Sequence, residues 1–151
     1  MRMIKEKGYC LTMKTKAFYY FVLMLLLASC GDGLTEKVVG TYDNGQPELV
    51  RYFNKENQCV REVYYHENGI KAMEGEMRDN LREGAWTGYF PDGKVQSTGF
   101  FEKGVRTGKA MVYHENGNLY MEGAYKDNKQ CGLWIYYDEQ GYEIQRIDFG
   151  E

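Results

Sequence analysis

A set of turn glycines spaced at one interval constrains the fold of this chain more than any other feature. They stand 24 residues apart, at Gly45, Gly69, Gly93, Gly117 and Gly141. The residues directly before them are Asn44, Asn68, Asp92, Asn116 and Gln140. Asn-Gly and Asp-Gly pairs are strong hairpin signals, because a type I′ turn needs a positive φ at both central residues. We therefore expect type I′ hairpin turns at these glycines.

Other residue types recur in the same 24-residue frame. In the central units, further glycines follow the turn glycine by six and by fifteen residues, at Gly75, Gly99, Gly123 and at Gly84, Gly108, Gly132. A second turn is predicted in each unit, at Asp79-Asn80, Lys103-Gly104 and Asp127-Asn128. Between the turns lie short segments rich in aromatic and β-branched residues, such as 85–90 and 95–101, which favours strands.

The repeat predicts an all-β fold, an elongated single-layer antiparallel meander of 24-residue hairpin repeats with about ten strands. A propeller blade takes about 40–45 residues, nearly twice this period, and no length signal indicates a closed barrel. The terminal units differ from the others. The first carries Arg51 and Val60 at the second and third glycine positions, and the last ends one strand past its turn. Atypical terminal units are expected as the caps of a stacked array.

The N-terminal segment has the pattern of a secretion signal. Lys14 and Lys16 precede a twelve-residue apolar run, residues 17–28. That run is too short for a membrane-spanning helix, which needs about 20 apolar residues, and fits the h-region of a signal peptide. It ends in Leu-Ala-Ser-Cys, which resembles the bacterial lipobox with Cys30 as the lipidated residue. An uncleaved N-terminal anchor is the alternative interpretation.

These observations divide the chain into a lipoprotein signal peptide (1–29), a lipidated Cys30 with a tether (30–40) and a repeat domain (41–151). Translation starts at Met1 or Met13, because the sequence from Met13 is a complete signal by itself. Either form places the domain in the bacterial cell envelope. We expect a lipid-anchored membrane protein on the periplasmic or cell-surface side.

Charge excludes one class of partner. Cys30 and the residues after it hold 14 of the 19 basic residues and 21 of the 22 acidic ones. A domain this acidic has no electrostatic basis for holding a phosphate backbone. We expect no nucleic-acid partner.

The residues that usually carry chemistry are too far apart in the predicted sheet. His66 and His114 are two units apart, or about 19 Å at the usual strand spacing, so they cannot share a metal. Cys59 and Cys131 are three units apart, or about 29 Å, which is too far for a disulfide. Ser97 is the only serine after Ser29 and replaces an apolar strand residue. We expect no catalytic residue, no metal, no cofactor and no enzymatic activity.

A tyrosine stands four residues before each of the last four turn glycines, at Tyr65, Tyr89, Tyr113 and Tyr137. Residues at one repeat position should form a ladder on one face of the sheet. Cross-strand aromatic packing is one explanation for such a ladder. A binding surface is the other, since a single-layer sheet leaves side chains exposed. These tyrosines are therefore the candidate binding face.

The run from Tyr113 to Asn128, YHENGNLYMEGAYKDN, resembles the MORN-repeat variant of YwqK-type antitoxins. Its pattern is a tyrosine, a polar-Gly turn, an apolar residue and then a Gly-aromatic-basic segment. The resemblance covers residues 40–151. It implies a non-enzymatic antitoxin or immunity protein that binds a protein toxin through its repeat sheet. The alternative is a structural or scaffolding cell-envelope lipoprotein that binds glycan or an assembly partner.

Overall fold

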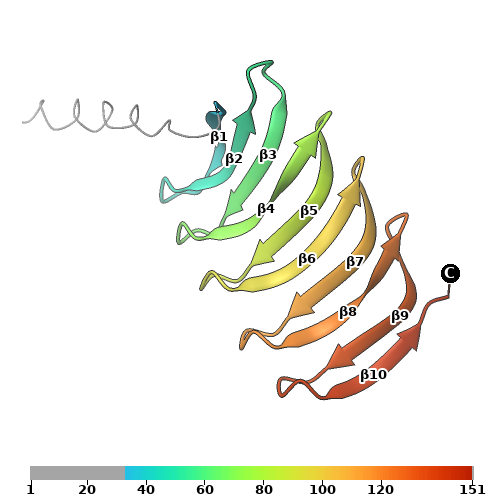
Figure 1. Cartoon of the computed structure of the whole chain (residues 1–151). Helices are drawn as coiled ribbons and strands as arrows, with labels where there is room; N and C mark the ends of the chain where they lie inside the picture. Colours follow the sequence, from blue (N-terminus) through green and yellow to red (C-terminus); the bar gives the residue numbers. More distant parts are fainter. Residues whose placement is uncertain (1–32, 151) are drawn as a thin grey trace, which may run out of the picture. The chain divides into compact units, whose positions relative to one another are not determined.

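The computed structural model describes residues 33–150, so the predicted signal peptide and Cys30 lie outside the described residues. Ten strands form one sheet in which every strand lies beside its neighbours in the sequence (Figure 1). They are β1 (Thr35–Thr41), β2 (Pro47–Phe53), β3 (Cys59–Tyr65), β4 (Lys71–Arg78), β5 (Leu81–Tyr89), β6 (Val95–Glu102), β7 (Val105–Tyr113), β8 (Leu119–Lys126), β9 (Lys129–Tyr137) and β10 (Glu143–Asp148).

All strand pairs are antiparallel, and the sheet is open, with β1 and β10 as its two edges. The all-β, single-layer meander predicted from the repeat is thus confirmed. The strands bow along their length, and successive hairpin turns alternate between the two ends of the strands (Figure 1). Within residues 33–150, no helix is long and apolar enough to cross a membrane.

The two sets of turns differ in backbone geometry, and the predicted turn type is wrong for the Asn-Gly set. Gly69 has φ 81°, but Asn68 is not among the residues with positive φ. The Gly69 amide donates to the His66 carbonyl, and the His66 amide donates to the Ile70 carbonyl, both at 2.8 Å. This is a type I turn followed by a left-handed glycine, the common three-residue hairpin loop. All five turn glycines have positive φ.

The type I′ geometry occurs at the other end of the strands. Asp79 and Asn80 have φ 52° and 61°, and Asp127 and Asn128 have φ 52° and 66°. Both central residues are therefore left-handed, as a two-residue type I′ loop requires. Asparagine and aspartate tolerate that conformation better than other residues with a side chain.

Strand β5 begins earlier than the sequence predicted, because Gly84 lies inside the strand. Gly84 has φ 68°, and the β4–β5 register shifts beside it, between Gly75 and Glu76. A left-handed glycine inside a strand marks a bulge, which adds a residue without ending the strand.

The repeat domain also begins earlier than predicted. The tether was assigned to residues 30–40, but Thr35–Gly40 belong to strand β1, which pairs with β2. The first unit differs from the others in its second turn as well. Residues 54–58 form a longer loop, in which Asn57 has φ 58°.

Candidate binding faces of the sheet

The register assigns the side chains to two faces, because directly opposite residues of an antiparallel pair lie on the same side. Trp86 lies opposite Gly75 and Gly99, and Trp134 lies opposite Ile147. We call the side with these rings the tryptophan face. The other side, which carries the tyrosines before the turns, is the tyrosine face.

The tryptophan face is held together by rings lying on glycines. Trp86 and Trp134 are 3% and 1% exposed. A Cβ added at Gly75 would overlap the ring of Trp86, and one at Gly123 would overlap the ring of Trp134. Each indole Nε1 also donates to a backbone carbonyl across the pair, at 3.2 Å. The repeated glycines at these positions therefore give the rings space on the sheet.

Other units fill the same positions differently. Ala110 stands at the tryptophan position in the unit between, and the guanidinium of Arg106 lies over Gly99 instead. In the first unit, Arg51 replaces the glycine and Glu62 replaces the tryptophan. These two form an ion pair at 2.8 Å in which Glu62 is 3% exposed. One repeat position thus accepts a ring, a guanidinium or a buried ion pair.

The tyrosine face carries a polar cluster centred on Glu74. Its carboxylate accepts hydrogen bonds from Arg61, Lys71 and the Tyr89 hydroxyl. Burial alone would raise the pKa of the Glu74 carboxyl. The hydrogen bonds from two cations and a phenol outweigh that effect and lower the pKa to about 2. The cluster holds Glu74 ionised at neutral pH.

Two units further on, the cluster recurs with one cation fewer. Glu122 accepts a hydrogen bond from the Tyr137 hydroxyl at 3.0 Å and pairs with Lys109 at 2.9 Å. In the unit between, Thr98 takes the glutamate position, and the Tyr113 hydroxyl contacts the Met111 sulfur. Tyrosine hydroxyls that are bonded within the sheet favour a packing role for these residues.

The fourth tyrosine of the ladder, Tyr65, lies on the same face, beside Tyr52. Burial first, and then the neighbouring Tyr65, raise the pKa of Tyr52 to about 12. The structure thus places all four tyrosines on one face. A role for them in binding a partner stays a prediction.

The turn asparagines connect neighbouring units. Asn68 Oδ1 accepts from the Ile70 amide, and Asn68 Nδ2 donates to the Pro91 carbonyl of the next turn at 2.9 Å. Asn44 and Asn116 make the same pair of bonds. Aspartate at position 92 has no amide to donate, and there Lys94 Nζ donates to the Glu115 carbonyl. The hairpin turns therefore form a hydrogen-bonded row along one end of the strands.

The histidines contribute hydrogen bonds to this row. His66 Nε2 lies 2.9 Å from the Tyr89 carbonyl, and His114 Nε2 lies 3.0 Å from the Tyr137 carbonyl. A carbonyl only accepts, so Nε2 carries the proton in both. Among residues 33–150, no three His, Cys, Asp or Glu side chains are grouped to hold a metal. Cys59 and Cys131 are free thiols in β3 and β9.

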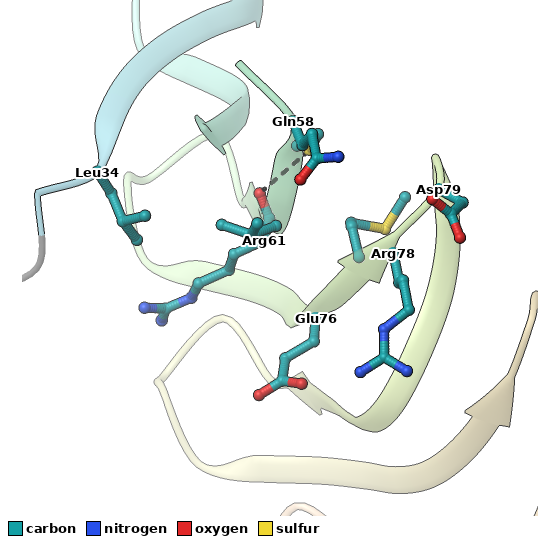
Figure 2. Close-up of a pocket in the computed structure, with 9 residues that line it drawn as sticks. Leu34, Gln58, Arg61, Glu76, Arg78 and Asp79 are labelled. Carbon is teal, nitrogen blue, oxygen red and sulfur yellow. Dashed lines mark hydrogen bonds between the residues drawn. The ribbon is translucent and has the colours of Figure 1, made fainter. Parts of the chain in front are cut away.

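A depression of about 450 Å³ lies beside Cys59, where β3 begins and β4 ends. Figure 2 shows Leu34, Arg61, Glu76 and Arg78 around it. Its lining carries both charge signs, so it selects no ligand by charge. Cys59 is 9% exposed, and burial raises the pKa of its thiol, which makes it a poor nucleophile.

Comparison with known families supports the repeat. Residues 82–103 and 106–127 match the model of the MORN repeat variant. Each match spans one pair of strands joined by a turn glycine, β5–β6 and β7–β8. MORN repeats indicate a repeat-based binding role.

No curated protein matches the chain. Among solved structures, it is similar to a Staphylococcus aureus TarM mutant in complex with fondaparinux, alpha-GlcNAc-glycerol and UDP. The identity is 15% and the TM-score 0.33. The match covers 78% of this chain and 24% of the other.

The tryptophan–glycine contacts were missed from the sequence, although a signal for them exists. The 24-residue units that begin at Tyr65 and Tyr113 are more alike than either is to the unit between them. They share residues 48 positions apart, including His66 with His114, Glu74 with Glu122 and Trp86 with Trp134. A search at twice the period would have singled out the tryptophans and glutamates that organise the two faces.

Proposed function

We propose that this protein is a non-enzymatic binding protein that holds another protein against its sheet. The observation that carries the proposal is the exposure of a rigid, single-layer sheet. Ten strands are joined side by side, and no other element within residues 33–150 covers either face. The rings, ion clusters and turn bonds described above hold the sheet in one shape without a second layer. A preformed surface loses little entropy when it binds.

The resemblance to YwqK-type antitoxins makes a protein toxin the first partner to test, with this chain as its immunity protein. Charge supports that choice. The domain is acidic, and its hairpin turns carry Glu67, Asp92, Glu115 and Glu139. An acidic inhibitor gains association rate toward a basic toxin by electrostatic steering. The same resemblance supports the absence of enzymatic activity, of a cofactor and of a nucleic-acid partner.

We further propose that Cys30 is lipidated and anchors the protein in the bacterial cell envelope. The lipobox directly after an apolar h-region supports this. Cys30→Ser should abolish incorporation of a palmitate analogue in metabolic labelling, while Cys10→Ser should leave it unchanged. Undiminished labelling of the Cys30→Ser protein would contradict the anchor.

The partner is tested by capture. The full chain, purified in mild detergent, serves as bait in lysate of its own organism, and bound proteins are identified by mass spectrometry. Recovery of one protein that is toxic when expressed without this chain supports the immunity function. Recovery of glycan or of envelope assembly proteins would instead favour the scaffolding lipoprotein, which remains the second candidate. A toxin gene beside this one would separate the two at once.

A further inference from the structure

The arginines of the domain divide into two groups. Residues 33–150 contain six arginines. Four of them form ion pairs with carboxylates: Arg51, Arg61, Arg78 and Arg146. Arg82 and Arg106 form none within the described residues, and both occupy the same position of neighbouring repeats. Two unpaired guanidiniums at one repeat position, in a chain rich in acids, require an explanation.

Aromatic rings fix both side chains in place. The Arg82 guanidinium carbon lies 4.2 Å from the centroid of the Trp86 ring. That of Arg106 lies 4.1 Å from the centroid of the Tyr125 ring. Stacking restrains the guanidinium plane of each side chain, and the Arg82 guanidinium also hydrogen-bonds the Tyr64 hydroxyl. Both side chains are half-buried, and Arg106 Nε is fully buried with no hydrogen-bond partner. Because the chain itself covers that Nε, a partner can reach only the terminal Nη groups of Arg106.

Acidic side chains are scarce on this face. One row of cross-strand neighbours on this face contains Trp86 and Trp134, and another row lies on either side of it. Among the described residues of these three rows, Glu62 is the only carboxylate. The Glu62 carboxylate already accepts hydrogen bonds from Arg51 and from the Tyr64 hydroxyl. The tyrosine face, in contrast, pairs its cations with Glu74 and Glu122. The tryptophan face therefore has a surplus of positive charge, although the domain as a whole is negative.

We propose that Arg82 and Arg106 are the binding site for an acidic segment of the protein partner, and that the tryptophan face is the docking surface. The inference rests on the proposed function, in that the partner is a protein; the acidic segment is a local feature of a partner whose overall charge is basic. The two guanidiniums are two strands apart, which is about 10 Å. Residues i and i+7 of a helix are about 10.5 Å apart on one side. Two carboxylates at that spacing can each accept hydrogen bonds from the terminal Nη groups of one arginine.

The test measures binding of a poly-L-glutamate peptide to the full chain in mild detergent, by calorimetry at low and high salt. Arg82→Gln/Arg106→Gln should weaken binding roughly tenfold or more, the scale of one lost charged contact. The matched control is Arg78→Gln/Arg146→Gln, which removes the same charge from the other face. It should change affinity by no more than about twofold, as expected for exposed charges.

The glutamine variant also loses the stacking on the rings, so weaker binding could result from misfolding. A second variant tests that alternative. Arg82→Lys/Arg106→Lys keeps the charge but not the planar fork, and should bind with an affinity between wild type and the glutamine variant. Equal losses in the glutamine variant and the control would show unspecific attraction and overturn the proposal. Absence of wild-type binding would overturn it as well.

Vesicles of phosphatidylglycerol distinguish an anionic membrane from an acidic protein. Binding to vesicles that depends on Arg82 and Arg106, without binding to the peptide, would overturn the protein partner in favour of lipid. These outcomes are separable from the proposed function. A protein captured equally by wild type and by the glutamine variant would leave that function intact and place its surface elsewhere.

Discussion

On the tryptophan face, Gly75 lies beneath the ring of Trp86, whereas on the tyrosine face Glu74 meets Tyr89, Arg61 and Lys71. Adjacent residues of one strand thus take part in two different kinds of contact. The first depends on shape, because a ring occupies the space that a side chain would need. The second depends on charge, because a half-buried carboxylate is held ionised by its partners. A larger side chain should therefore destabilise the tryptophan face, and a change of pH should alter the stability that the tyrosine face contributes.

The largest effect is expected from filling the space under a ring. In Gly75→Ala the new Cβ would overlap Trp86, so the ring must move or the strands must separate. We expect a loss of about 3 kcal/mol, the upper range for overpacking a tight site. Gly99→Ala is the matched control, because its Cβ meets only the end of the flexible Arg106 side chain. Equal losses in denaturant unfolding would show that the rings do not hold this face together.

The next effect concerns the turns, which both faces share. Gly93 and Gly141 have φ 88° and 86°, where a β-branched residue is strained. Gly93→Val in the central unit should lose more than about 1 kcal/mol. Gly141→Val should lose less, because only β10 follows it. Thermal unfolding measures both, and an equal loss would contradict an array in which each unit contacts only its neighbours.

A smaller effect is expected from the charge on the tyrosine face. The lowered pKa of Glu74 means that its contribution to stability is complete above the unfolded value of 4.5 and is lost as the pH falls toward about 2. We expect Glu74→Gln to cost about 1 kcal/mol at neutral pH, since the exposed parts of its cationic partners are screened. The difference from wild type should shrink between pH 4.5 and pH 2.

Glu122→Gln is the control for that measurement. Hydrogen bonds from Lys109 and Tyr137 lower the pKa of Glu122, but without a second cation. Its pH dependence should therefore be weaker. If Glu74→Gln stays less stable than wild type by the same amount at low pH, the carboxylate charge is not what stabilises this face.

The smallest effect is expected at the row of turns. Asn68→Asp keeps the acceptor for the Ile70 amide but loses the donor to the Pro91 carbonyl. An exposed hydrogen bond of this kind is worth about 0.5–1 kcal/mol. Asp92→Asn should be nearly neutral, because Lys94 already makes the contact to the next turn. A loss on Asp92→Asn as large as that on Asn68→Asp would show that the row is not built from these donors.

The sequence predicted the order and the number of the strands because glycine marks each Asn-Gly turn. It did not predict the turn type there. The loop pairs His66 with Ile70, so it holds three residues, and a loop of that length takes a type I turn in which Asn68 does not need a positive φ. The sequence also predicted a strand that starts only at residue 85, whereas β5 starts at Leu81 and continues through a bulge at Gly84. A glycine with positive φ looks the same in sequence whether the chain turns or bulges.

The candidate site was harder to predict for a related reason. The tyrosine ladder recurs before the last four turn glycines, so one period reveals it. Trp86 and Arg106 do not recur in every unit, and the space for each depends on a glycine in the neighbouring strand, Gly75 and Gly99. Such pairs become visible only when the register is known. The sequence likewise does not show that Arg82 lacks an ion-pair partner, because that depends on which side chains the fold places beside it.

The glycine–tryptophan pairs occur in every second unit, and this restricts how two copies of the chain can exchange strands. The hairpins β4–β5 and β8–β9 both present a glycine and a tryptophan to their neighbours, whereas β6–β7 presents Gly99 and Ala110. A strand exchange that is out of step by one unit would set a ring against a position built for a methyl group. An exchange out of step by two units would place glycine against tryptophan again, because Gly75 and Trp86 correspond to Gly123 and Trp134. If two copies exchange strands, a shift of 48 residues should therefore be favoured over a shift of 24 residues.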